Sequence, residues 1–175
     1  ETSGWPPQGR MSNVDIYDIH VASKLKESGR KVAYILVDAL RYELGVALEK
    51  RLADDGPVEL QAAYAQLPTI TAVGMASLLP GAREGLRLCD EGGKLVPKLG
   101  DVKVSNVSQR MDVFRKRLGD RFHEMTLNDF VKGKPRFSKT VDLLVLRSTE
   151  IDSQLESNPE STLGLIPNTL KYVRV

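Results

Sequence analysis

The chain has 175 residues, of which 41% are hydrophobic and 27% are charged, and its formal net charge at pH 7 is +2. This length suits one domain with a real core, and the near balance of charge gives no electrostatic reason to expect a nucleic-acid or membrane partner. Cys89 is the only cysteine, which excludes internal disulfides and cysteine-rich metal sites and fits a cytoplasmic protein. No run reaches the roughly 20 consecutive apolar residues that a membrane-spanning helix needs, so no membrane partner is expected.

The N-terminal segment, residues 1–12, is polar and rich in turn-forming residues. We expect it to be a linker that precedes a single domain over residues 13–175. The chain has neither an initiator Met nor a signal peptide, so we expect it to be a piece of a longer protein.

The first elements form a helix–strand–helix pattern. Residues 15–28 predict an amphipathic helix, because apolar residues recur there at helical spacing. Residues 32–37 are β-branched and aliphatic without polar alternation, which is typical of a parallel strand buried on both faces. The strand ends at Asp38, and a second helix is predicted over residues 40–53. The residues expected to face the core are Ile16, Ile19, Ala22 and Leu25 in the first helix, and Leu40, Leu44, Ala47, Leu48 and Leu52 in the second.

The rest of the chain continues to alternate between strand and helix patterns. Strands are predicted over residues 58–66, 102–107 and 140–146, and a hairpin over residues 86–99. A helix over residues 109–118, capped by Ser108, is expected to turn Met111, Phe114 and Leu118 inward. The alternation predicts an α/β fold with a mostly parallel sheet flanked by helices.

Polar residues follow three of the predicted strands where each one ends: Asp38, then Thr69 and Thr71, then Asp152 and Glu156. Parallel strands bring their carboxyl ends to one edge of the sheet, where ligands bind, so these groups can converge. Carboxylates there suit a divalent cation, and a threonine hydroxyl beside the cation can become a nucleophile. A structural alternative stays open for each residue: Asp38 and the threonines cap helices, Asp152 lies in a turn and Glu156 is solvated.

Three segments carry a resemblance to a known family: Asp38-Ala-Leu-Arg-Tyr-Glu43, Leu67-Pro-Thr-Ile-Thr-Ala-Val-Gly-Met75 and Glu150-Ile-Asp152. Together they resemble the PglZ domain, a branch of the alkaline phosphatase superfamily, over roughly residues 25–175. PglZ proteins are known from bacterial phage-defence systems of the BREX type. The resemblance implies an alkaline-phosphatase-like core and a two-metal phosphohydrolase or phosphodiesterase that uses zinc or manganese and a threonine nucleophile.

The resemblance assigns roles to the first two segments. It implies that Asp38 binds one metal and that Thr71 is the nucleophile, because Thr71 and Gly81 keep the family's spacing. Thr69 is the alternative nucleophile. Arg41 is placed to contact a phosphate oxygen of the substrate, and a solvated surface arginine is the other interpretation.

The third segment implies that Asp152 binds the second metal. Glu156 stands where the superfamily has a histidine, and a carboxylate there would favour manganese or magnesium over zinc. A further Asp-His pair and a later histidine of the superfamily are missing, since the only histidines are His20 and His123.

These absences lead us to expect a domain truncated at its C-terminus, ending in a helix after Pro167, with its two divalent ions weakly held or absent. The expected partners are a phosphoester substrate, with nucleotides and nucleic acids among the options, and other defence-system proteins. The alternative function is a catalytically silent interaction module of a defence or signalling complex.

Overall fold

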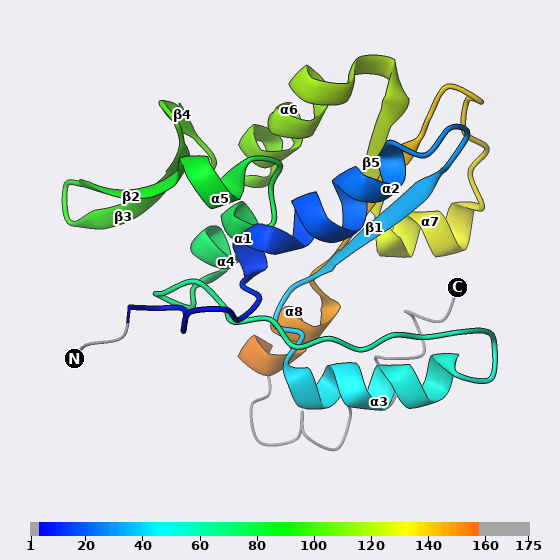
Figure 1. Cartoon of the computed structure of the whole chain (residues 1–175), viewed down its shortest axis with the longest axis horizontal. Coiled ribbons are helices and arrows are strands. Elements are labelled where there is room, and N and C mark those ends of the chain that lie inside the picture. Colours follow the sequence, from blue (N-terminus) through cyan, green and yellow to red (C-terminus); the bar gives the residue numbers. More distant parts are fainter. Residues whose placement is uncertain (1–3, 158–175) are drawn as a thin grey trace. The chain divides into compact units, whose positions relative to one another are not determined.

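The computed structural model describes residues 4–157, so the helix expected after Pro167 lies outside the described residues. The described chain divides into two compact units. The first unit comprises residues 4–34, 63–123 and 138–144, and the second comprises residues 35–62, 124–137 and 145–157. Figure 1 labels the helices and strands along the chain.

A three-stranded parallel sheet has the order β1 (Val32–Val37), β6 (Leu143–Ser148), β5 (Phe122–Thr126). The Val32 N–H donates to the Asp142 carbonyl (2.7 Å), and the Asp38 N–H donates to the Ser148 carbonyl (2.9 Å). Both bonds join residues separated by the same number of positions, so β1 and β6 run in the same direction. The observed sheet with its helices confirms the predicted α/β class with a parallel sheet.

Strand β6 is the central strand of this sheet, and its side chains are buried on both faces, with Leu143 and Val145 fully buried. The sequence predicted this strand over residues 140–146, three residues too early at its start and two at its end. Each of the three strands is divided between the two units: its first residues belong to the first unit, and residues 35–37, 124–126 and 145–148 belong to the second. The second unit therefore contains the carboxyl end of every strand of the sheet.

Strand β1 differs from its prediction in one respect, because only one of its faces is buried. Tyr34 and Leu36 are buried, whereas Ala33 and Ile35 are exposed. β1 stands at an end of the strand order, so β6 is its one neighbour in the described sheet. The expectation of burial on both faces is therefore wrong for the described residues.

The first helical segment is continuous but irregular: α1 (Asn13–Ile16), a π-helix (Tyr17–Ala22) and α2 (Ser23–Leu25). Its buried residues are Tyr17 and Val21, and Ile19 is 46% exposed. The predicted inward position is therefore wrong for Ile19, and Ile16, Ala22 and Leu25 are only half-buried. The π-helix bonds each residue to the fifth residue along, which rotates the side chains away from the regular helical pattern.

Four aromatic side chains form the core of the first unit. The Tyr17 ring lies 6.2 Å from that of Tyr34 and 5.7 Å from that of Phe114, which stacks on Phe122 at 5.4 Å. Phe114 belongs to α6 (Val107–Leu118) and is buried as predicted, together with Met111.

The N-terminus of α6 was predicted at the wrong residue. Asn106 rather than Ser108 caps the helix, because its side chain accepts from the Gln109 N–H (2.9 Å) and the Gln109 side chain returns a bond to the cap. This reciprocal pair is a capping box. The helix consequently begins at Val107. Of the strand predicted over residues 102–107, only Val102–Lys103 forms.

The predicted hairpin is confirmed, and it belongs to a small antiparallel sheet in the first unit (Figure 1). Its strands are β2 (Leu86–Glu91), β3 (Lys94–Leu99) and the short β4 (Val102–Lys103). Gly92 and Gly93 both have positive φ, which is the conformation that a two-residue hairpin turn demands. Two short helices precede the hairpin, α4 (Thr71–Ser77) and α5 (Ala82–Gly85).

The second unit adds three helices to the strand ends: α3 (Tyr42–Leu52), α7 (Leu127–Gly133) and α8 (Glu150–Ser157). Leu40 lies before α3 and is exposed, so its predicted inward position is wrong. The chain after α3 returns along that helix in an extended conformation (Figure 1). A Cβ at Gly45 would lie 3.3 Å from Leu60 Cδ1, so a glycine allows this close approach.

The strand predicted over residues 58–66 does not form. Among the described residues, this segment has only an isolated bridge between Tyr64 and Ser12. Met11 and Asn13 supply the hydrogen-bond partners of the Tyr64 backbone, and the Trp5 indole N–H donates to the Ala65 carbonyl (2.8 Å). Within residues 4–157, no helix has the length and apolar character needed to cross a membrane.

Burial raises the pKa of Tyr34, whose hydroxyl donates to the Leu78 carbonyl (3.2 Å). The folded state therefore holds the phenol proton more tightly than the unfolded state, and this stabilisation is complete below the unfolded pKa of about 10. We expect the free energy of unfolding to fall as the pH rises above about 10, and Tyr34→Phe to flatten that fall. Denaturant titrations across this range test it, with the exposed Tyr64→Phe as control. Equal pH dependence in both variants would contradict the assignment to Tyr34.

Candidate active site

Asp38 lies directly after β1 and is only 9% exposed. Its N–H donates to the Ser148 carbonyl, and its own Oδ1 accepts from the Ala39 N–H (3.0 Å). Helix α3 begins at Tyr42 with Arg41 as its N-cap. Asp38 is therefore not the N-cap of that helix, so the prediction that it caps α3 is wrong.

The turn after Asp38 is conformationally demanding. Ala39 has a φ of 57°, a left-handed conformation that costs an L-residue about 1–2 kcal/mol. The chain needs this turn because it leaves the strand at Asp38 and starts α3 four residues later. Arg41 is exposed and stands at the N-cap, just before the helical turn in which it was expected.

The other predicted metal ligands lie on α8, which begins two residues after β6 ends. Asp152 is half-buried in the first turn of the helix, so it does not lie in a loop turn. Glu156 is exposed one turn later, on the same side of the helix as Asp152. Asp38, Asp152 and Glu156 all belong to the second unit.

Within residues 4–157, no group of three or more His, Cys, Asp or Glu side chains is arranged to hold a metal ion. The metal ligands therefore stay a prediction from the sequence. What the structure adds is the common location of the three carboxylates in the unit that contains the carboxyl ends of the strands.

Both candidate nucleophiles belong to the first unit. Thr71 is the first residue of α4 and is exposed; Thr69 is exposed in the preceding loop. Ile70 is the N-cap and makes no side-chain capping bond, so neither threonine is the cap of α4. The segment before them is not a strand, so their predicted place at a strand end is wrong.

Thr71 is nevertheless well placed to meet an anion. The first N–H groups of any helix lack partners within the helix, and they carry the positive end of its dipole. Thr71 carries its hydroxyl at that end of α4, where it is exposed to solvent. Ten residues later Gly81 has a φ of 76°, which explains why a glycine closes this segment.

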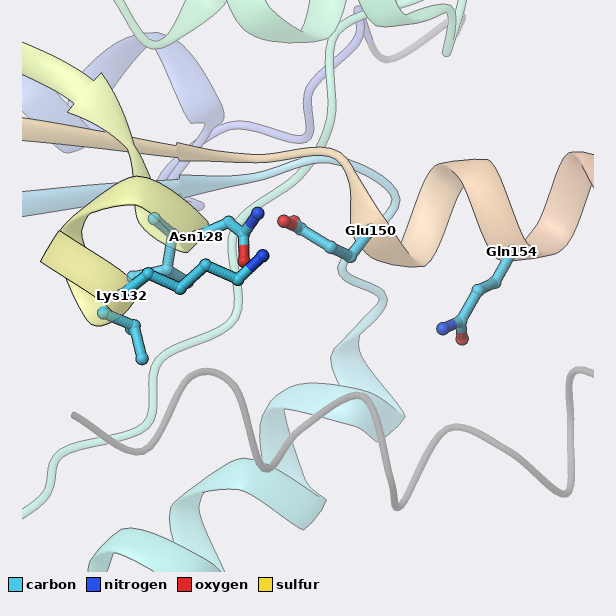
Figure 2. A pocket seen from close by; sticks show the side chains of 6 residues that line it. Asn128, Lys132, Glu150 and Gln154 are labelled. Atoms are coloured by element: carbon cyan, nitrogen blue, oxygen red, sulfur yellow. The ribbon is translucent and has the colours of Figure 1, made fainter.

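A cavity of about 310 Å³ lies beyond the carboxyl ends of β5 and β6, between helices α7 and α8. Its described lining consists of Leu127, Asn128, Val131 and Lys132 from α7, and Glu150 and Gln154 from α8. Figure 2 shows Asn128 and Lys132 pointing toward Glu150, while Gln154 lies further along α8 and turns away.

Sequence reasoning missed this cavity because it assigned no element to residues 122–133. One signal was present in the sequence. Thr126 is a residue type that often caps helices, and apolar residues follow it at helical spacing. In the structure the Thr126 side chain does cap α7, because it accepts from the Asp129 N–H (3.0 Å). Arg147 adds to this part of the sheet by donating from Nε and Nη2 to one Glu124 oxygen (3.0 and 2.8 Å), which joins β6 to β5.

Comparison with known proteins gives one family. Residues 16–92 match the PglZ family, described as the BREX system PglZ alkaline phosphatase-like domain. The match confirms the resemblance over this segment, which contains Asp38 and Thr71 but not Asp152 or Glu156 and covers less than half of the 175 residues. No curated protein and no solved structure matches the chain. An alkaline phosphatase-like domain indicates a phosphoesterase-type superfamily, and the parallel sheet with flanking helices is consistent with it.

Ala39 provides a test of the turn that positions Asp38. Ala39→Gly is expected to leave the protein as stable as before or more stable by up to about 1 kcal/mol, since glycine adopts positive φ without strain. Ala39→Val should lower the free energy of unfolding by about 1 kcal/mol or more, because a β-branched residue is poorly tolerated there. Urea titrations of both variants measure the difference. Equal losses of stability in the two variants would show that Ala39 is not left-handed.

Proposed function

We propose that this chain contributes to a metal-dependent phosphoesterase, of the type found in phage-defence systems, with Thr71 as its nucleophile. The observation that carries the proposal is the exposed Thr71 hydroxyl at the start of α4, inside the segment that matches an alkaline phosphatase-like domain. An exposed hydroxyl at a helix N-terminus suits attack on a phosphate group, because the helix favours the negative charge of the substrate.

The proposed metal ligands are Asp38 for one divalent cation, and Asp152 with Glu156 for the other. These residues fit such cations in kind, because carboxylate oxygens are hard ligands that manganese, magnesium and zinc all accept. The Asp38 carboxylate also has the fixed orientation that suits a metal ligand, since its burial and the hydrogen bond from the Ala39 N–H restrict its movement. When bound, zinc or manganese would neutralise phosphate charge and lower the pKa of a nearby hydroxyl.

In the proposed reaction the Thr71 Oγ1 loses its proton and attacks the phosphorus. The bond between phosphorus and the leaving oxygen breaks, the leaving oxygen takes up a proton, and a phosphothreonine forms. A water molecule then attacks the same phosphorus, which releases the phosphate group and returns the Thr71 hydroxyl. The N–H groups of the first turn of α4 would stabilise the charge on the phosphate oxygens.

A second candidate function is a catalytically silent interaction module that binds other proteins of a defence or signalling complex. The feature that favours it is Glu156, which stands where the superfamily has a metal-binding histidine and is exposed to solvent. A phosphothreonine at residue 71 would distinguish the two functions, since a silent module forms none.

Substitution of Thr71 tests the nucleophile. With bis-nitrophenyl phosphate as substrate and manganese or zinc present, Thr71→Ala is expected to lower the rate of cleavage by at least about 100-fold. Thr140→Ala, which alters an exposed threonine in a loop, is the matched control and should keep the rate. Mass spectrometry of the quenched reaction should find a nitrophenylphosphoryl group on Thr71, because attack on this diester releases one nitrophenol and keeps the other on phosphorus. A loss of activity in Thr69→Ala with retention in Thr71→Ala would transfer the role to Thr69.

Removal of metal tests the carboxylates. Dialysis against a chelator should abolish the cleavage, and manganese or zinc should restore it. Asp38→Asn and Asp152→Asn should each weaken manganese binding measured by calorimetry, because each removes a charged ligand. Activity that survives chelation would contradict metal dependence.

A further inference from the structure

The cavity between α7 and α8 combines an apolar floor with a polar rim. Leu127 is buried and Val131 half-buried, whereas Asn128 and Lys132 are exposed around the opening and Glu150 is half-buried. Small-molecule sites have this composition: apolar walls and a few polar groups that fix the orientation of the ligand. A volume of about 310 Å³ stands at the small end of the usual range of about 300–1,000 Å³, so the cavity suits a small ligand.

Two opposite charges face this cavity from different helices. Lys132 on α7 and Glu150 on α8 point toward one another in Figure 2, but they form no ion pair with each other within residues 4–157. The buried Ser148 donates its hydroxyl to a Glu150 oxygen, which holds the carboxylate in place. The arrangement therefore presents a cationic donor and an anionic acceptor to the same space, which a ligand can enter.

The ligand that satisfies both charges needs an acceptor and a donor side by side on one edge. Guanine has this edge: its O6 accepts hydrogen bonds, and its neighbouring N1–H and N2–H₂ donate them. Lysine commonly donates to O6 and N7 of guanine, and carboxylates accept from base N–H groups. Adenine and cytosine each present a single N–H donor group beside a ring-nitrogen acceptor, so the Glu150 carboxylate could accept from only one group of either base, whereas guanine offers it two adjacent donor groups.

We infer that this cavity binds a guanine base, with Lys132 and Asn128 donating to O6 or N7, Glu150 accepting from N1–H and N2–H₂, and Leu127 and Val131 contacting the ring. Apolar side chains hold extruded bases in the same manner in enzymes that act on nucleotides. The inference rests on the proposed function only in assigning the base to the phosphoester substrate. The cavity and Asp38 both belong to the second unit, which contains the carboxyl ends of the strands.

Binding measurements on the 175-residue chain test the inference without requiring turnover. Calorimetry with guanosine, GMP, AMP, CMP and pyrophosphate, in the absence of metal, separates recognition of the base from recognition of phosphate. We expect guanosine and GMP to bind at least about tenfold more tightly than AMP and CMP. Pyrophosphate that binds as tightly as GMP, or AMP that binds as tightly as GMP, would overturn the inference. Failure of the phosphoesterase proposal would instead appear in the nitrophenyl assay and leave this selectivity intact.

Two variants assign the contacts. Lys132→Met and Glu150→Gln should each weaken GMP binding by about 10- to 100-fold, because each removes a charge-assisted hydrogen bond. Glu150→Gln should also narrow the preference for GMP over AMP, since an amide can donate to the adenine N1. Lys50→Met and Glu43→Gln, at exposed positions of α3, are the matched controls and should bind GMP normally. Equal weakening in variants and controls would overturn the assignment.

A measurement on the unaltered protein covers the case in which a variant fails to fold. The side-chain amide of Asn128 gives its own nitrogen–proton NMR signals, and guanosine should shift them. The side-chain amide of Gln61, in the segment that follows α3, should stay unchanged. Guanosine binding that leaves the Asn128 signals in place would overturn the inference.

Discussion

Strand β6 is hydrogen-bonded to a parallel neighbour on each side, and its own side chains are buried on both faces. The bond from the Asp38 N–H to the Ser148 carbonyl fixes the end of β1 level with the end of β6. This alignment decides which residues follow the sheet: Asp38 after β1, the N-terminus of α7 after β5 and Glu150 after β6. A shift of β6 by one residue would turn its buried side chains to the opposite faces and displace α8. Both the carboxylates and the cavity therefore depend on the pairing of this strand.

The sequence predicted the elements whose burial is uniform or whose turn chemistry is local. The apolar run of β6 and the Gly92-Gly93 hairpin are of this kind. The sequence could not show that only one face of β1 is buried, because an apolar run looks the same whether one face of a strand or both are covered. The alternation over residues 58–66 was misleading, since within residues 4–157 this segment makes only an isolated bridge and a strand needs a partner for its backbone groups.

The sequence identified those candidate site residues whose position follows from the local pattern around them. Asp38 ends an apolar run, and Thr71 starts a helical pattern, so both were found. Lys132 and Glu150 look like ordinary charged helix residues in the sequence. Their proposed role in binding becomes visible only in the structure, where two helices bring them to one cavity. Such a pairing arises from tertiary structure, and the spacing between residues 132 and 150 gives no sign of it. Ala39 illustrates a third case: its backbone is left-handed, and an alanine in the sequence gives no sign of that conformation.

The π-helical segment Tyr17–Ala22 affects how this chain should be aligned with its homologues. A π-helix inside an α-helix accommodates one extra residue without breaking the helix on either side of it. A relative that keeps a regular α-helix here is expected to be one residue shorter between Ser12 and Leu25, with its buried residues otherwise in the same places. An alignment without a gap would then pair Tyr17 with the wrong residue of that relative. Comparisons of this protein with distant homologues should place a one-residue gap within the π-helix, where the structure absorbs it.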